Sequence, residues 1–188
     1  MKKLLLVLCL VIFMSPVFAA SFVSTDGDIS VTAEVLQMSA KVIKAKNKIY
    51  LNTVSEKKDK ISIQCNQMTI KTNSQGLKNI NDLSECEVSG NVRVKYGSNI
   101  NNGKVYCLAF AKSAYYENKT KKLVLSGNVK IDYVNEKGAK LSAKGKKAVV
   151  DMSKDPKPDD VLFSIEGEDN SDAKIIADSN ILDEENKE

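Results

Sequence analysis

Apolar and polar residues alternate along most of this chain. Val92, Val94 and Tyr96 are separated by Arg93 and Lys95, and residues 129–133 follow the same order of apolar and charged side chains. A period of two places one set of side chains on one face of an extended strand and the other set on the opposite face. The pattern therefore predicts strands that each have one apolar and one polar face.

The same four residues open two of these runs. Ser89-Gly90-Asn91-Val92 returns as Ser126-Gly127-Asn128-Val129, 37 residues later. Both glycines share the parity of the inward apolar residues, so each either leaves room inside a groove or lets its strand bend. The phrase is predicted to mark where a strand coils around a cavity. Gly167, 40 residues after Gly127, extends this into a repeat built from hairpins.

Apolar and polar residues also alternate, less regularly, before and after these two runs. Strands are predicted over residues 29–35, 49–53, 61–70, 86–96, 105–116, 123–133, 141–152, 161–167 and 173–177. Within 61–70 the parity switches between Cys65 and Met68, which predicts a bulge or a bend. Residues 72–83 are rich in Asn, Ser, Gly and Asp and are predicted to form a loop. The fold class is predicted to be all-β and antiparallel, with roughly 12–16 short strands in one elongated domain.

Both ends of the chain are predicted to lie outside this domain. Met1-Lys2-Lys3, the apolar run 4–14 and the small residues around Ala19 are typical of a secretory signal peptide, residues 1–19. The alternative is an uncleaved anchor, but the apolar run is shorter than the about 20 residues that span a bilayer. The domain itself is predicted over residues 20–182, and residues 183–188 are predicted to be a frayed acidic tail.

Charge is unevenly distributed along the sequence. Residues 1–150 carry a net charge of +13 and residues 151–188 carry −9, for a total of +4. A basic body suits an anionic partner such as phosphate groups, a membrane surface or nucleic acid. The alternative is that basic residues fill the solvent face of a sheet, which is where the alternation places Arg93, Lys95 and Lys130.

The residues needed for several kinds of chemistry are missing. The chain has no histidine, which excludes a Ser-His-Asp or Cys-His site within one chain, and it has no glycine-rich phosphate-binding motif. Removing the signal peptide leaves Cys65, Cys86 and Cys107, so at most one intrachain disulfide can form, and the sequence does not select the pair. Their equal spacing is not a metal-binding pattern. No catalytic residue, metal site or cofactor is predicted.

The predicted inward face is aliphatic and contains few bulky side chains. One interpretation is a thin but ordinary core. The other is a groove that receives acyl chains while basic rims face anionic head groups. The groove residues are predicted to be Ile61, Ile63, Val88, Val92, Val94, Leu123, Leu125, Val129, Ile131, Phe163 and Ile165.

Residues 114–129 read Ala-x-Tyr-x-x-x-x-x-x-Leu-x-Leu-x-Gly-Asn-Val, and a return strand follows at 148–152. This pattern resembles the OstA-like periplasmic lipopolysaccharide-transport family, the LptA-like proteins. The resemblance covers residues 28–177 and is strongest over 86–152. It implies an open, twisted, V-shaped antiparallel β-jellyroll that holds lipopolysaccharide acyl chains between its sheets and is not an enzyme. The sequence departs from the family pattern in two places. The first copy of the repeat reads Leu51-Asn52-Thr53-Val54, with Thr where the later copies have Asn, and residues 72–85 form an insertion that the repeat does not need.

The resemblance also implies a role and a set of partners. The role is that of a periplasmic bridge that carries lipopolysaccharide, through its lipid A, from the inner to the outer membrane. The partners are an inner-membrane LptC-like protein at the N-terminal edge near 29–35, an outer-membrane LptD-like translocon at the C-terminal edge near 173–177, and further copies joined head to tail. The alternatives are a membrane-anchored LptC-like component and a non-transport β-repeat protein of the cell surface. Nucleic-acid binding is not expected, because the chain carries an export signal and lacks a stacking platform.

Overall fold

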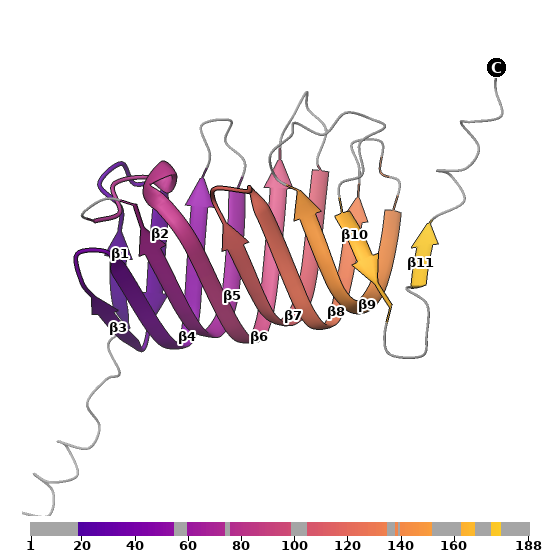
Figure 1. Cartoon of the computed structure of the whole chain (residues 1–188), viewed down its shortest axis with the longest axis horizontal. Coiled ribbons are helices and arrows are strands. Elements are labelled where there is room, and N and C mark those ends of the chain that lie inside the picture. Colours follow the sequence, from indigo (N-terminus) through magenta and orange to yellow (C-terminus); the bar gives the residue numbers. More distant parts are fainter. Residues whose placement is uncertain are drawn as a thin grey trace, which may run out of the picture.

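The computed structural model describes residues 19–54, 60–73, 76–98, 105–134, 138, 140–151, 163–167 and 174–177. Within these ranges the chain forms a single 11-stranded antiparallel sheet (Figure 1). Apart from Ala19, the expected signal peptide lies outside the described residues, as does the expected tail 183–188. No helix in the described ranges is long and apolar enough to cross a membrane.

The sheet is built from short and long strands with one short helix between them. The elements are β1 (Ala20–Val23), β2 (Ile29–Ala33), β3 (Val35–Met38), β4 (Val42–Val54), β5 (Lys60–Thr72), the 3-10 helix η1 (Ile80–Asp82), β6 (Leu83–Ser98), β7 (Val105–Glu117), β8 (Lys122–Val134), β9 (Lys140–Asp151), β10 (Phe163–Glu166) and β11 (Lys174–Ala177).

Six long strands, β4 to β9, lie side by side in the order in which they occur in the chain. At one end of the molecule β4 pairs with two short strands, with β2 through residues 50–53 and with β3 through residues 43–46. At the other end β9 does the same, with β10 through residues 147–150 and with β11 through residues 141–144. β1 pairs with β2. The sheet therefore ends in two short edge strands at each end.

Each long strand bends near its middle, so that the sheet folds back on itself as two layers (Figure 1). We call them layer A and layer B. Layer A contains β1, β2, residues 49–54, 60–65, 92–98, 105–111, 129–134 and 140–145, and β11. Layer B contains β3, residues 42–46, 67–72, 83–89, 113–117, 122–126 and 146–151, and β10. The side opposite the bends, where the strands end, is called the mouth.

Left-handed backbone produces the bend in every second long strand. In β4, β6 and β8 the ladder skips at the bend, because these strands carry one residue more than the next strand along the chain. Such an insertion is a bulge, which bends a strand and increases its twist. Two consecutive residues have positive φ at each of these three bends: Asn47 (61°) and Lys48 (45°) in β4, Gly90 (79°) and Asn91 (54°) in β6, and Gly127 (78°) and Asn128 (51°) in β8.

The repeated Ser-Gly-Asn-Val is thus the signature of a bend. A Cβ atom on Gly90 would lie 2.8 Å from the Cβ atom of Asn66, and one on Gly127 would lie 2.9 Å from that of Lys112. Both contacts are with the bend of the neighbouring strand. Of the two roles expected for these glycines, the structure supports bending and close strand approach rather than extra room inside a groove.

The first copy of the bend is not where the sequence pattern placed it. The register of β4 against β5 is continuous through 51–54, and its shift falls between Lys46 and Ile49. The equivalent of Gly90-Asn91-Val92 is therefore Asn47-Lys48-Ile49, and the assignment to 51–54 is wrong. Asn is one of the residues that tolerates left-handed backbone, so this bend forms without a glycine.

The predicted all-β antiparallel fold is confirmed, and so is the irregularity between Cys65 and Met68, where the ladder of β5 with β6 skips between Gln64 and Gln67. The expected 12–16 short strands are instead 11 within the described residues, because β4 to β9 are each 12 to 16 residues long. Pairing continues on both sides of each bend, so each of these chain segments counts as one long strand rather than two short ones. The predicted ranges 61–70, 86–96, 105–116, 123–133 and 141–152 correspond to β5, β6, β7, β8 and β9, one range to one strand. The predicted strand 29–35 is divided between β2 and β3.

Candidate functional site

Continuous rows of apolar side chains line the facing surfaces of the two layers. Within a row, each residue is the register partner of the next, so a row crosses all six long strands. One row of layer A is Leu51, Ile63, Val94, Ala109, Ile131 and Ala143. The corresponding row of layer B is Ala45, Met68, Val88, Ala114, Leu125 and Ala148. Together these rows form an apolar trough that runs from one end of the sheet to the other.

The structure brings the predicted groove residues together in this trough. Those buried in one apolar cluster are Val88, Val92, Val94, Leu125, Val129 and Ile131, each no more than 7% exposed. Those that pack against the cluster with part of the side chain exposed are Ile61, Ile63, Leu123 and Ile165. Phe163 begins β10 and pairs with Val150, and its side chain lies outside the described set.

Exposure of these inward side chains increases from the bends to the mouth. Along β6, Val92 is 1% exposed, Val94 is 7% exposed and Tyr96 is half-buried. Along β8, Leu125 is 1% exposed and Leu123, which lies farther from the bend, is half-buried. The two layers therefore form a wedge that is sealed at the bends and more accessible at the mouth.

The deep part of this wedge is packed. Because its side chains are almost fully buried, a ligand chain can lie between the layers only if the layers move apart. Such a movement exchanges side chain–side chain contacts for side chain–ligand contacts and keeps the apolar surface away from water. The hydrophobic effect is non-directional and depends on the area buried, so contacts with another apolar surface would keep these side chains out of water as the opposite layer does.

Residues 76–82 fasten the two layers across the mouth at the N-terminal end. This segment joins β5 to β6 on the layer B side, and it contacts the turn between β1 and β2 on the layer A side. The Asp26 amide donates to the Lys78 carbonyl (3.0 Å), and the Ile80 amide donates to the Asp28 carboxylate (2.8 Å). Asp28 also accepts from the Ser24 hydroxyl (2.7 Å). Leu77 of this segment is buried in the core, so polar and apolar contacts act together.

Among the described residues, Cys65, Cys86 and Cys107 are free thiols. Burial raises the pKa of Cys65 to about 11 and that of Cys107 to about 11. Burial, assisted by the nearby Cys65, raises the pKa of Cys86 to about 12. All three are therefore uncharged at neutral pH and belong to the apolar lining. Cys107 lies at the mouth between Tyr96 and Tyr133 in the register of layer A.

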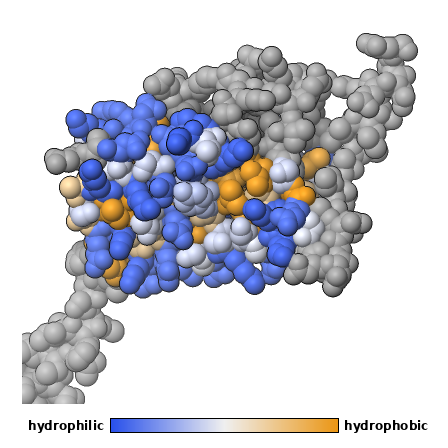
Figure 2. All heavy atoms as spheres, in the orientation of Figure 1, coloured by the Kyte–Doolittle hydropathy of each residue, from blue (hydrophilic) through white to orange (hydrophobic). Residues whose placement is uncertain are grey.

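The outer faces of the two layers differ in charge. The alternation of apolar and polar residues does not predict this difference, because it does not show which layer each strand segment belongs to. In Figure 2, hydrophilic residues cover most of the described surface on the layer B side, with an apolar patch toward the C-terminal half. The outward residues of layer B mix both signs: Lys44, Lys46, Lys71, Lys122 and Lys147 with Glu85, Glu87, Glu117 and Glu166. Those described for the long strands of layer A are mostly basic: Lys60, Arg93, Lys95, Lys130, Lys140 and Lys144, with the carboxylate of Asp132.

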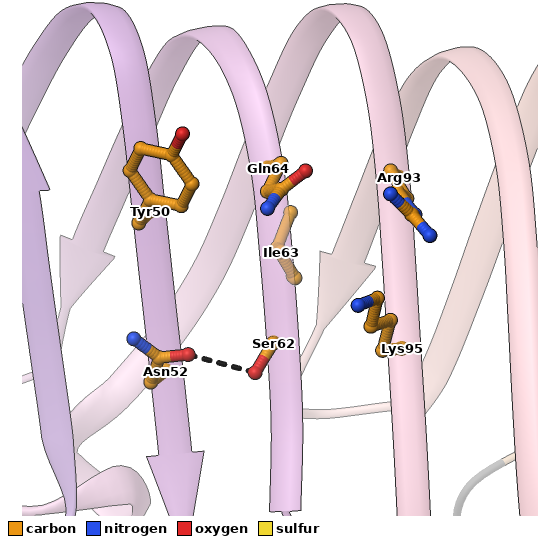
Figure 3. Close-up of a pocket in the computed structure, with 7 residues that line it drawn as sticks. All are labelled: Tyr50, Asn52, Ser62, Ile63, Gln64, Arg93 and Lys95. Carbon is orange, nitrogen blue, oxygen red and sulfur yellow. Dashed lines mark hydrogen bonds between the residues drawn. The ribbon is translucent and has the colours of Figure 1, made fainter.

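A cavity of about 130 Å³ opens on this basic outer face (Figure 3). Ser62 donates a hydrogen bond of 2.7 Å to the Asn52 side-chain oxygen beside it. The sequence pattern assigned Arg93 and Lys95 only to a solvated sheet face and gave no sign of a cavity there. The residues that line it, from β4, β5 and β6, are Tyr50, Asn52, Ser62, Ile63, Gln64, Arg93 and Lys95.

Comparison with known proteins connects this architecture to lipopolysaccharide transport. A family model described as LptA/(LptD N-terminal domain) LPS transport protein matches residues 30–156. The structure is similar to the crystal structure of LptH from Pseudomonas aeruginosa, described as the LptA homologous periplasmic component of the conserved lipopolysaccharide transport device. The TM-score is 0.52 at 14% sequence identity, over 81% of this chain and 96% of that chain. No sequence among the curated proteins matches this chain.

Proposed function

Because the chain belongs to the LptA/(LptD N-terminal domain) family of LPS transport proteins, we propose that it binds lipopolysaccharide with the acyl chains between layers A and B. The observation that carries this proposal is the continuous apolar trough, whose side chains become more exposed toward the mouth. A trough of this kind suits a ligand with several acyl chains, because each buried CH₂ group contributes about 0.8 kcal/mol.

The acyl chains enter from the mouth, in the part of the molecule that residues 76–82 do not fasten. At the N-terminal end the hydrogen bonds to Asp26 and Asp28 hold the layers together. Along β6 to β8 the described contacts between the layers are apolar, and these are the contacts that an acyl chain can replace.

The open ends of the sheet support the further proposal of a periplasmic bridge from the inner to the outer membrane. Unpaired strand edges are templates for β-strand addition. Three of the exposed large apolar residues lie on the two N-terminal edge strands: Val23 (59% exposed) in β1, and Val35 (43%) and Met38 (53%) in β3. An LptC-like partner or a preceding copy would pair there, and an LptD-like translocon or a following copy would pair with β10 and β11.

This arrangement corrects the edge expected from the sequence. Residues 29–33 form β2, which lies between β1 and β4 and is not an edge strand. The N-terminal edge instead consists of β1 and β3. The strand expected near 173–177 is β11, which pairs with β9 at the C-terminal end.

Two neighbouring residues of β8 provide a test of the trough. A photo-crosslinking amino acid at Leu123 lies on the inner face near the mouth, and the same amino acid at Val124 lies on the outer face of layer B. We expect lipopolysaccharide to be labelled from position 123 and not from position 124. Equal labelling from both positions, or labelling from position 124 alone, contradicts the proposal.

A further inference from the structure

Arg93 is the only arginine in the sequence, and it lines the cavity on the outer face of layer A. Its guanidinium carbon lies 5.5 Å from the centre of the Phe110 ring on β7, which is a cation–π distance. Its Nε atom is buried and has no hydrogen-bond partner among the described residues. A buried donor without a partner is unfavourable for the folded protein. The guanidinium is thus fixed in place with hydrogen-bonding capacity that the described part of the chain does not use.

The cavity carries positive charge that neighbouring carboxylates do not compensate. Lys95 follows Arg93 on the same face (Figure 3), and neither forms an ion pair with a carboxylate among the described residues. Asp132, the carboxylate on the outer face of the long strands here, is bound by Lys130 (2.7 Å) and by the Ser142 hydroxyl (2.7 Å). Two neighbouring cations without an acid favour an anion from outside the chain.

The rest of the wall is polar and partly aromatic. Asn52, Ser62 and Gln64 present amide and hydroxyl groups that both donate and accept hydrogen bonds. Tyr50 is 48% exposed and adds an aromatic ring at one side of the cavity (Figure 3). The volume of about 130 Å³ is well above the about 10–15 Å³ that a single ordered water needs, which leaves room for a small polar group such as a phosphate.

We propose that this cavity binds the phosphate group of a phosphorylated saccharide. Arg93 and Lys95 contact the phosphate oxygens, because a guanidinium offers a planar pair of donors and an ammonium adds a second charge. Asn52, Gln64 and Tyr50 contact the sugar. Apart from Ile63, which belongs to the trough row, the lining residues lie on the outer face of layer A, opposite the trough. Glucose 1-phosphate can therefore occupy the cavity whether or not acyl chains bind in the trough.

The side-chain Nε–H signal of Arg93 gives a direct test. With a single arginine in the chain, a two-dimensional ¹H–¹⁵N spectrum contains one arginine Nε–H signal from the protein itself. We expect glucose 1-phosphate to shift this signal in a saturable way, inorganic phosphate to shift it with weaker affinity, and glucose to leave it unchanged. A signal that stays in place during the glucose 1-phosphate titration overturns the proposal.

Matched variants separate a built site from general attraction to a basic face. Arg93→Gln and Lys95→Gln are expected to weaken glucose 1-phosphate binding about 10- to 100-fold, followed on the side-chain amide signals of Asn52 and Gln64. Arg93→Lys keeps the charge but loses the planar donors, so we expect about a tenfold loss. The control is Lys144→Gln, the same change of charge on the same outer face but away from the cavity, with less than about a twofold effect. Equal losses in Lys144→Gln and Lys95→Gln contradict the proposal, provided that thermal unfolding shows all variants to be folded.

The phosphate has two possible sources, a free saccharide or the head group of a lipid held in the trough. Deacylated lipopolysaccharide, which keeps its phosphorylated sugars, and intact lipopolysaccharide distinguish them. Equal affinities for the two forms, read from the Arg93 signal, assign the site to a free saccharide. A shift by the intact form alone assigns it to the head group of a bound lipid, and no shift with either form overturns the site.

Discussion

The N-terminal end and the repeat region formed by β6 to β8 hold their two layers together differently. At the N-terminal end the layers are joined at the bend of β4 and again at the mouth, where residues 76–82 bond to the β1–β2 turn. In the repeat region, bends at Gly90 and Gly127 join the layers on one side, and apolar contacts hold them together elsewhere. Hydrogen bonds therefore join the layers across the mouth at the N-terminal end, whereas in the repeat region the described contacts between the layers are apolar, and we expect that section to widen more readily.

The largest effect is expected from changing a bend of the repeat region. Gly127→Leu places a side chain at φ +78°, with its Cβ atom 2.9 Å from Lys112. Left-handed backbone costs an L-residue about 1–2 kcal/mol, and the close contact adds to it, so we expect a loss of about 2–4 kcal/mol in the free energy of unfolding. Chemical denaturation followed by circular dichroism measures this loss.

The matched control for that bend is Gly97→Leu on β6. A Cβ atom on Gly97 would meet no heavy atom within 4 Å, and the backbone there is not left-handed, so we expect a change of less than about 1 kcal/mol. Similar losses for Gly127→Leu and Gly97→Leu would mean that the bend does not require glycine.

A smaller effect is expected from releasing the mouth at the N-terminal end. Asp28→Ala removes the acceptor of the Ile80 amide and of the Ser24 hydroxyl. Leaving these groups unpaired costs about 1–3 kcal/mol, and hydrogen exchange of the Ile80 amide should accelerate more than that of β8 amides.

The control for the mouth is Asp26→Ala. The Asp26 carboxylate accepts a hydrogen bond from the Asn79 side chain (3.0 Å), and that contact is exposed to solvent. Water can replace an exposed partner, so we expect a loss of less than about 1 kcal/mol. Uniform acceleration of exchange throughout the sheet in Asp28→Ala would show that residues 76–82 are not a local fastening.

The smallest effect is expected from chemical modification of the three thiols, whose rates of modification show where the two layers separate. Their pKa values of about 11 to 12 keep them protonated at pH 8, and the thiolate fraction rises about tenfold per pH unit below the pKa. Between pH 8 and pH 10 we expect iodoacetamide to modify Cys107, at the mouth, faster than the fully enclosed Cys86, as measured by peptide mass spectrometry. Lipopolysaccharide should slow the modification of Cys107. Modification of Cys86 at the same rate as Cys107 would contradict the predicted order of opening.

Much of the fold could be predicted from the sequence, because strand alternation and the repeated Ser-Gly-Asn-Val act locally. They indicated an antiparallel all-β repeat, the irregularity in β5 and the inward set that the structure brings into one cluster. The first bend was misplaced because Asn47-Lys48 adopts left-handed backbone without the glycine that marks the later copies. The contact between Asp28 and Ile80 joins residues 52 positions apart, and no local pattern specifies it.

The outer cavity was missed for a similar reason. Its lining comes from three strands, and alternation alone assigns Arg93 and Lys95 to a solvated face. One signal was present in the sequence: a single arginine in a chain that otherwise uses lysine for its positive charges. Arginine differs from lysine in offering planar, bidentate hydrogen bonding. The sequence does not show, however, which residues surround Arg93 in the fold.

At each end of the sheet, the outermost long strand pairs with two short strands: β4 with β2 and β3, and β9 with β10 and β11. These end pairings do not depend on how many long strands lie between β4 and β9. Duplicating one 37-residue interval, from Gly90 to Gly127, would add two strands at roughly 4.8 Å each and extend the molecule by about 10 Å. The terminal strands would keep their partners, so a gene duplication inside this chain can change its span while its two ends stay the same.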